Sequence, residues 1–228
     1  MISDLVRYPG YKRDYRAYVV RPKVAYTSPA ILLLHDRWGL TEEVREFAHR
    51  LVHEGYVVMV PDLYDGKHPQ SEGEAKQWMH QLTLKDGLEE VRLALAWLRN
   101  QAYTKSHLTS VVGFEHHGTL GLLSGILPRF HPRAIVLFCS PVSQVIDQVR
   151  GLHSAVQAHF GERDRNVPRG DVEAFQMALA TAGVPHEVHI YAGLKHDFMR
   201  PGSKDYSEEA ARLAWERMLS FLSAQMAR

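Results

Sequence analysis

The segment Leu108-Thr-Ser-Val-Val-Gly-Phe-Glu-His-His-Gly118 gives the strongest indication of the fold of this chain. Its first half has the apolar pattern of a buried strand and reaches Gly113, after which small residues predict a helix over 119–126. A strand, a sharp turn and a helix in this order are typical of a nucleophile elbow, in which the residue at the tip faces the top of an α/β sheet. The tip residue here is Glu115.

The rest of the chain alternates short apolar runs with amphipathic segments. The apolar runs predict strands over 15–20, 30–34, 56–60, 108–112, 134–138, 155–160 and 187–191, the first of them at a sheet edge. Helical periodicity predicts helices between Thr41 and Gly55 and over 71–99 (with a break near 85–87), 119–126, 172–182 and 207–226. Apolar strands that alternate with helices indicate a parallel sheet covered on both faces. We therefore expect the α/β class: a single doubly wound, mostly parallel sheet flanked by helices, with residues 1–228 in one domain.

Composition and charge argue against several classes of partner. Of the 228 residues, 45% are hydrophobic and 23% are charged, as in an ordinary globular protein. The formal net charge of +1 gives no basis for binding nucleic acid. No apolar run approaches the roughly 20 residues that span a bilayer, so we expect no membrane partner. The one cysteine, Cys139, cannot form an intramolecular disulfide, and we expect a cytoplasmic protein that is a monomer or homodimer.

Polar loops follow four of the predicted strands, at 35–39, 115–118, 162–166 and 195–197. Ligands of open α/β sheets bind outside the carboxyl ends of the strands, where such loops lie. Three of the loops supply Glu115, Asp164 and His196 in that order. A residue at an elbow, then an acid, then a histidine is the chain order of the α/β-hydrolase triad.

The sequence resembles the dienelactone hydrolase family along nearly its whole length. The segments that carry the resemblance are Leu32-Leu-Leu-His-Asp-Arg-Trp-Gly-Leu40, Pro61-Asp-Leu-Tyr64, Gly113-Phe-x-x-x-Gly118, Phe160-Gly-x-x-Asp-x-x-Val-Pro168 and Gly193-x-x-His-Asp-Phe198. Together they are specific in order and spacing. The resemblance implies an α/β-hydrolase fold and an ancestry of ester or lactone cleavage.

The resemblance also implies roles for individual residues. His196 becomes the base and Asp164 the group that orients it. The backbone N–H groups of Arg37 and His116 become the oxyanion hole. Asp36 matches an acidic position that restrains the nucleophile, and Arg200 matches a position that binds a substrate carboxylate. We expect Trp38, in the same loop as Asp36, to contact the substrate as well.

Two positions of the elbow depart from the family pattern. The family has cysteine, or serine in relatives, where this chain has Glu115, and glycine where it has His117. Both replacements are larger, so we expect crowding that remodels the turn and displaces the oxyanion hole. Cys139 and Ser140 follow another strand and occupy no elbow. We therefore expect Cys139 to be a buried core thiol rather than a substitute nucleophile.

Several roles for Glu115 stay open on the sequence alone. Attack on an ester carbonyl would form an anhydride, so attack at a saturated carbon, as in the aspartate-dependent α/β-hydrolases, is the more natural covalent route. A second role is general base on water. In a third arrangement, Glu115 pairs with protonated His196 or with an arginine, and the site is inactive. If Asp36 faces Glu115, one of the two carboxyl groups should have a raised pKa.

The predicted function follows from these alternatives. His35, Asp36, Glu115, His116, His117 and His196 offer donors for zinc, but their spacing matches no zinc motif, so we expect no metal and no cofactor. We expect a hydrolase of a small ester, lactone or related molecule with the variant triad Glu115, Asp164 and His196. The alternative is a catalytically disabled homologue that acts as a binding or regulatory protein.

Overall fold

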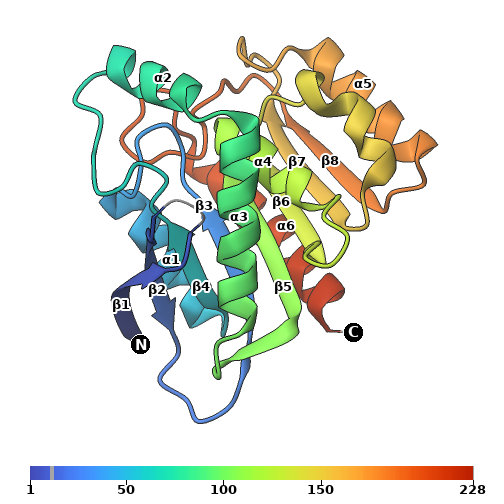
Figure 1. The fold of residues 1–228 in the computed structure, drawn as a ribbon. Coiled ribbons are helices and arrows are strands. Elements are labelled where there is room, and N and C mark those ends of the chain that lie inside the picture. The colour runs from blue at the N-terminus through green and yellow to red at the C-terminus, as the bar shows by residue number, and fades with distance from the viewer. Residues whose placement is uncertain (11–12, 228) are drawn as a thin grey trace.

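One sheet runs through the whole structure, with helices on both of its faces (Figure 1). This computed structural model describes residues 1–10 and 13–227. The strands are β1 (Ile2–Tyr8), β2 (Tyr15–Arg21), β3 (Ser28–Leu34), β4 (Val57–Pro61), β5 (Thr104–Phe114), β6 (Ala134–Phe138), β7 (Ala155–Gly161) and β8 (His186–Tyr191). Their order across the 8-stranded sheet is β1-β2-β4-β3-β5-β6-β7-β8. Strands β3 to β8 run parallel, and β1 and β2 are antiparallel to their neighbours.

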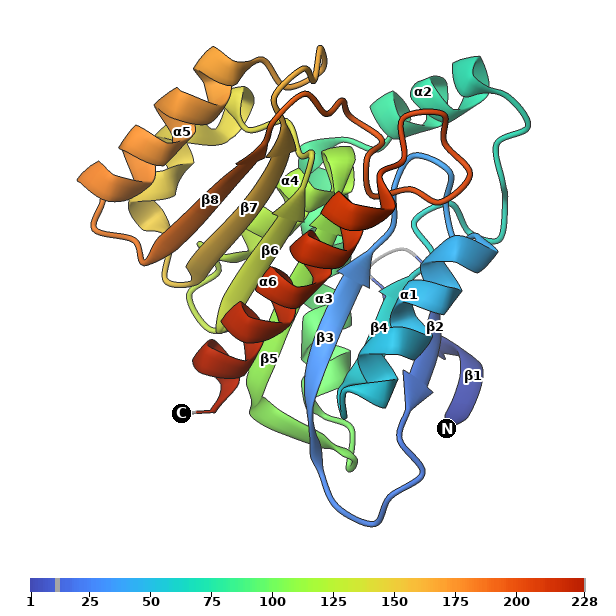
Figure 2. The same cartoon turned by 180° about the vertical axis from the view of Figure 1, so that it is seen from behind.

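The helices divide between the two faces of the sheet. They are α1 (Glu42–His53), α2 (Glu72–Gln81), α3 (Leu84–Arg99), α4 (Glu115–Ser124), α5 (Arg169–Thr181), α6 (Glu208–Met226) and the 3-10 helix η1 (Ser143–Gly151). Helices α3, α4 and α5 cover one face, and α1 and α6 cover the other (Figure 2). Every residue of β4, β6 and β7 is buried, as expected for strands with helices on both sides. The predicted α/β class is confirmed. Over the described residues, no helix combines the length and apolarity needed to cross a bilayer.

The carboxyl ends of the parallel strands meet at one edge of the sheet. Helix α2 lies beyond that edge, together with the long segment that joins β8 to α6 (Figure 1). The loops after β3, β5, β7 and β8 open there, which brings together the four polar loops that the sequence indicates. The site is therefore assembled by the topology of the sheet.

The strand expected at 15–20 is not at the edge of the sheet. It is β2, and β1 pairs with it on its outer side, from Ile2 opposite Arg21 to Tyr8 opposite Tyr15. Most of β1 is exposed or only partly buried, so its residues show neither the apolar run nor the clean alternation that indicates a strand. That is why the sequence pattern does not indicate β1.

Two helix boundaries also differ from the prediction. The break in the long helical stretch comes at Leu82 and Thr83, and Thr83 caps α3 by accepting a hydrogen bond from the Asp86 N–H. Gly87 lies inside α3, where an added Cβ would come within 2.6 Å of Leu120, so this glycine permits the close approach of α3 and α4. Helix α4 begins at Glu115 instead of near 119.

Candidate active site

Glu115 occupies the tip of a sharp turn between β5 and α4. Its φ of 50° lies in the left-handed region, which costs a non-glycine residue about 1–3 kcal/mol. The turn closes through two glycines: a Cβ on Gly113 would lie 2.6 Å from the Cα of Gly118. The elbow geometry is therefore retained, and the expected remodelling of the turn is wrong.

His117 is accommodated because its ring turns away from the tip into the interior. Its Nδ1 lies 2.8 Å from the backbone oxygen of His35, and its ring meets the His35 ring edge-on at 4.8 Å. The ring of Tyr64 packs against it at 5.7 Å. Burial and the neighbouring His35 lower the pKa of His117 to about 3, so the ring is neutral. His117 is thus a packing residue behind the elbow.

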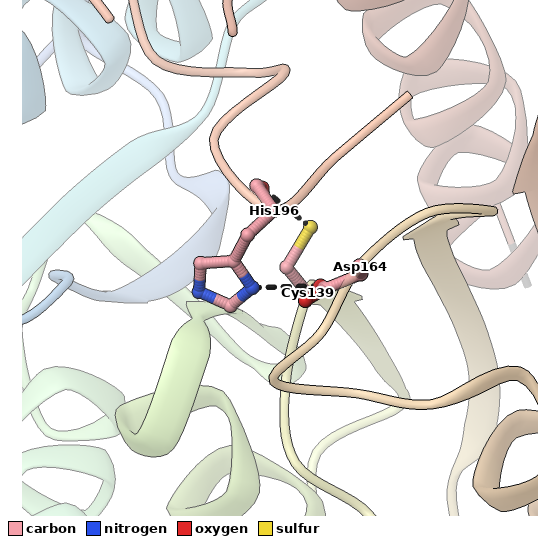
Figure 3. Close-up of side chains that lie close together, drawn as sticks. All are labelled: Cys139, Asp164 and His196. Carbon is pink, nitrogen blue, oxygen red and sulfur yellow. Dashed lines mark hydrogen bonds and ion pairs between the residues drawn. The ribbon is translucent and has the colours of Figure 1, made fainter. Parts of the chain in front are cut away.

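Asp164 and His196 form a hydrogen-bonded pair. Nδ1 of His196 lies 2.7 Å from Oδ2 of Asp164, as Figure 3 shows. The other carboxylate oxygen of Asp164 accepts the backbone N–H groups of Asn166 and Val167, at 2.8 and 3.2 Å. These bonds fix the carboxylate in the loop after β7. They hold the imidazole so that its Nε2 lies 3.5 Å from Oε1 of Glu115.

The side chain of Arg37 binds the same glutamate. Nη1 of Arg37 forms a short ion pair with Oε1 of Glu115, and the Arg37 backbone N–H donates to Oε2 at 3.3 Å. The guanidinium also meets Asp197, with Nη2 at 3.3 Å from Oδ2, and its Nε lies 3.2 Å from Glu72 at the start of α2. Arg37 is buried, so these charges compensate one another in a largely dry environment.

The electrostatics of the site keep Glu115 ionised and His196 protonated. Burial would raise the pKa of Glu115, but the hydrogen bond to His196 and the charge of Arg37 outweigh it and lower that pKa. Burial would likewise lower the pKa of His196, but the hydrogen bonds to Asp164 and Glu115 raise it to about 10. At neutral pH the resting site therefore holds a carboxylate, an imidazolium and a guanidinium in contact.

Asp36 and Glu115 form the pair of carboxyl groups that the sequence predicts. Burial and the charge of Glu115 raise the pKa of Asp36 to about 7. Its Oδ1 accepts the backbone N–H of Trp38 at 2.8 Å, which ties the carboxyl group to its own loop. One of the two carboxyl groups thus has a raised pKa, as the sequence predicts. It is Asp36, and Glu115 is the more acidic group.

The remaining predicted residues flank this centre on different sides. The Arg200 guanidinium lies over the Trp38 ring, 5.0 Å from its centroid, and meets no carboxylate within 4 Å among the described residues. Asp36 and Arg200 line a small cavity that reaches Glu115, whereas Trp38 lines only a neighbouring, wider one. His116 lines neither of these two cavities, and the centroid of its ring lies 5.7 Å from that of the His80 ring. The structure therefore gathers Glu115 and His196 with their partners and leaves Trp38 at the periphery.

Cys139 lies beside His196 and Asp164. Its Sγ donates to the backbone oxygen of His196 at 2.9 Å, and Figure 3 shows the thiol beside the Asp164 carboxylate. Burial and the nearby Asp164 raise its pKa well above the usual range for a thiol. Because nucleophilic cysteines react as thiolates, this environment suits a packing residue.

Two groups of metal-ligating atoms lie close together within residues 1–10 and 13–227. One contains Glu115, His196 and Asp197, and the other contains Cys139, Asp164 and His196. The members of both groups are engaged with other protein groups, because Arg37 binds Glu115 and Asp197 and because Asp164 binds His196. The guanidinium supplies the positive charge between the carboxylates.

Sequence reasoning missed three side-chain contributions to the site. The sequence predicts a role for the Arg37 backbone N–H and leaves open a pairing of Glu115 with an arginine, but it does not indicate that Arg37 is that arginine. Asp197 stands out only as part of the Gly-x-x-His-Asp-Phe segment. No sequence pattern indicates a role for Glu72 in the site, because acidic residues are favoured in the first turn of a helix. The pairing of charges across loops was the information that local patterns lacked.

The sheet and the helices that flank it have the architecture of the α/β-hydrolase fold. The profile of the dienelactone hydrolase family matches residues 15–226, and the chain belongs to that family. The carboxymethylenebutenolidase of Pseudomonas putida is 26% identical to it, over 98% of this chain and 97% of the relative. The family resemblance is thus confirmed, and with it a family of hydrolases and esterases.

Solved structures support the fold. A dienelactone hydrolase-like promiscuous phosphotriesterase from metagenomic libraries superimposes with a TM-score of 0.89 at 17% identity, covering 98% of each chain. Esterase 2 of Thermogutta terrifontis gives a TM-score of 0.74 at 18% identity, covering 97% of this chain and 92% of the esterase. At these identities the likeness concerns the fold alone.

Proposed function

We propose that this chain hydrolyses a small ester, lactone or related molecule through Glu115, Asp164 and His196. The observation that carries the proposal is the continuous contact from Asp164 through His196 to Glu115, at 2.7 and 3.5 Å, with Glu115 at the strained tip of the elbow. Backbone strain at such a position is expected where the chain must present a side chain to a reactant.

The resting protonation states favour attack by Glu115 at a saturated carbon. The glutamate is ionised, and so it has an electron pair to donate. His196 is protonated, so it begins the reaction as an acid and not as a base. In a first step, a Glu115 oxygen bonds to the alkyl carbon of the substrate, and the alkyl carbon–oxygen bond breaks. The electron pair leaves with the substrate carboxylate, which pairs with the positive charges of His196 and Arg37.

The second step hydrolyses the glutamyl ester. Alkylation removes the negative charge of Glu115, which is one cause of the raised pKa of His196, and the imidazolium then releases its proton to solvent. Neutral His196 accepts a proton from water as hydroxide attacks the Glu115 carboxyl carbon. The oxyanion forms on the oxygen held by the Arg37 backbone N–H. Collapse expels the alcohol, which takes the proton from His196. The Glu115 carboxyl group then passes its own proton to His196, which restores the resting carboxylate and imidazolium.

The other predicted residues take supporting roles in this scheme. The His116 backbone N–H is the second donor proposed for the oxyanion. Asp36, whose pKa is about 7, presents a partly protonated carboxyl group next to the nucleophile. Arg200 lies over the Trp38 ring and places a positive charge near the Asp36 and Glu43 carboxyl groups, at the wall of the cavity that reaches Glu115.

A single-turnover reaction in water labelled with heavy oxygen tests the covalent route. Enzyme in excess is mixed with substrates from an ester, lactone and haloalkanoate panel, and the Glu115 peptide is then weighed by mass spectrometry. We expect the label in the Glu115 carboxylate, and a trapped glutamyl ester in His196→Ala. Label found only in the product acid would show that water attacks the substrate directly and would contradict a nucleophilic Glu115.

A binding or regulatory protein is the second candidate, and the Arg37–Glu115–His196 ion pairs favour it. They satisfy the charges of all three groups without a substrate. On this reading, wild type is inactive on the whole panel and Glu115→Cys gains esterase activity. Activity that is present in wild type and lost in both Glu115→Gln and His196→Ala would eliminate this candidate.

A further inference from the structure

Two separate cavities meet at the Glu115–His196 pair. We call the first the apolar chamber; it has a volume of about 70 Å³, and its walls are formed chiefly by Val44, Phe47, Phe114, Phe138 and Met199. We call the second the polar chamber; it has a volume of about 350 Å³, and its walls include Lys76, His80, Ser143, Gln144 and Asn166. Glu115 and His196 line both chambers. A bond that reacts at this pair therefore has one side in each chamber.

The aromatic walls of the apolar chamber brace one another. The Phe47 ring meets Phe114 edge-on at 5.2 Å and meets Trp215 at 4.9 Å. Phe138 stacks on Phe114 at 5.0 Å and on the buried ring of His159 at 4.7 Å. Close-packed rings of this kind yield little to a larger guest, because interiors resist overpacking. The chamber therefore limits the size of what enters it.

The volume of the apolar chamber sets that limit. A water-sized group needs about 10–15 Å³ in this measure, so about 70 Å³ admits roughly five non-hydrogen atoms. The aromatic and aliphatic walls favour an apolar group. A short alkyl group fits this description, and a chain of more than about six carbons does not.

The polar chamber offers mainly neutral hydrogen-bonding groups. Lys76 lies 3.7 Å from Glu72, and Arg37 is held by Glu115 and Asp197, so the full positive charges there already have partners. The side chains of Ser143, Gln144 and Asn166 make no hydrogen bond within the described part of the chain. They suit a hydroxylated or amide-bearing group. Arg37 and His196 lie on this side as well, where the carboxylate of a cleaved ester would emerge.

We infer that the substrate is an ester whose alcohol part is a compact alkyl group of about five non-hydrogen atoms and whose acid part is larger, uncharged and polar. The alkyl group occupies the apolar chamber and the acid part occupies the polar chamber. This inference rests on the proposed function, since it needs a reacting bond at Glu115 and His196. It adds which half of the substrate each chamber selects.

Four esters test the inference: the ethyl and octyl esters of glyceric acid and of hexanoic acid. We expect ethyl glycerate to have the highest kcat/KM, by about 10-fold or more over octyl glycerate, because an oversized chain cannot enter the chamber. Met199→Ala should raise kcat/KM for octyl glycerate by a larger factor than kcat/KM for ethyl glycerate. Met177→Ala is the matched control, because Met177 is exposed on α5.

The polar chamber is tested with Gln144→Leu. We expect this variant to lower kcat/KM for ethyl glycerate by about 10-fold more than kcat/KM for ethyl hexanoate, because only the glycerate hydroxyl groups can form the lost hydrogen bond. Gln176→Leu, at an exposed position of α5, is the matched control. Equal turnover of all four esters by wild type would overturn the inference and leave the proposed function standing.

Absence of turnover would refute the proposed hydrolysis, and binding then decides the inference. Dissociation constants of the four esters are measured by calorimetry. The two chambers are supported if the esters bind in the order expected for kcat/KM and if Met199→Ala and Gln144→Leu change the dissociation constants in the corresponding directions. No binding, or equal binding of all four, overturns them.

Discussion

The Arg37 side chain and backbone both bind the Glu115 carboxylate: the guanidinium pairs with Oε1, and the backbone N–H donates to Oε2 at 3.3 Å. One residue therefore holds both oxygens of the glutamate that stands where the family has its nucleophile. Its position 78 residues away in the sequence makes this a relationship of the tertiary structure. The guanidinium allows a buried carboxylate at a site built for a small neutral or thiol side chain.

Substitution of Arg37 alone should lower the stability of the fold. We expect Arg37→Met to lower the free energy of unfolding by about 3–5 kcal/mol, because it leaves buried Glu115 with fewer partners. The double variant Arg37→Met/Glu115→Gln should lose about 0.5–3 kcal/mol less than the sum of the single variants. Urea denaturation measures all three. The exposed pair Arg212–Glu216 is the control, with a coupling of about 0.5 kcal/mol or less; additive losses at Arg37 and Glu115 would contradict the prediction.

Stability should fall in alkaline solution. The folded-state pKa of His196 is about 10 against an ordinary value of 6.5, so its protonation stabilises the fold fully below pH 6.5 and this stabilisation is lost as the pH rises through 10. Each unit of pKa difference corresponds to about 1.4 kcal/mol. Denaturation across this range measures the decline. Glu115→Gln removes one cause of the shift, so its decline should be smaller; an unchanged slope in that variant would speak against the ion pair.

The elbow should not tolerate a side chain at Gly118. A Cβ there would lie 2.0 Å from Oγ of Ser140 and 3.0 Å from the backbone oxygen of Gly113, and the backbone cannot move aside without opening the turn. We expect Gly118→Ala to lower the free energy of unfolding by about 1–3 kcal/mol. Gly170→Ala is the matched control, since nothing lies within 4 Å of its Cβ position. Equal stability of the two variants would show that the elbow packs less tightly.

The thiol of Cys139 should be dispensable for turnover. We expect Cys139→Ala to hydrolyse its substrate at the wild-type rate, whereas Glu115→Gln is inactive, because the buried thiol is protonated and its Sγ is bound to the His196 backbone oxygen. Iodoacetamide should leave native protein unmodified and label it after unfolding. Loss of activity in Cys139→Ala, with the fold intact by circular dichroism, would assign the chemistry to the cysteine instead.

The class of fold and part of the site can be predicted from sequence patterns. Apolar runs such as 134–138 and 155–160 predict strands because burial on both faces leaves no polar position along them. The elbow could be predicted from Gly113 and the strand before it, because a sharp turn requires particular residues at particular positions. Asp164 and His196 could be named because each lies in a local segment that is similar to the family pattern.

The surroundings of Glu115 depend on contacts between distant parts of the chain. Loops far apart in the chain meet at the carboxyl ends of the strands, so Arg37 reaches Asp197 across 160 residues and Glu72 approaches from a surface helix. Local periodicity reports which face of an element is buried, but it carries no record of which charge meets which. The direction of the His117 ring was fixed in the same way, by the space left between His35 and Tyr64. Pairing of charges and filling of space depend on distance in three dimensions, and only the folded chain sets those distances.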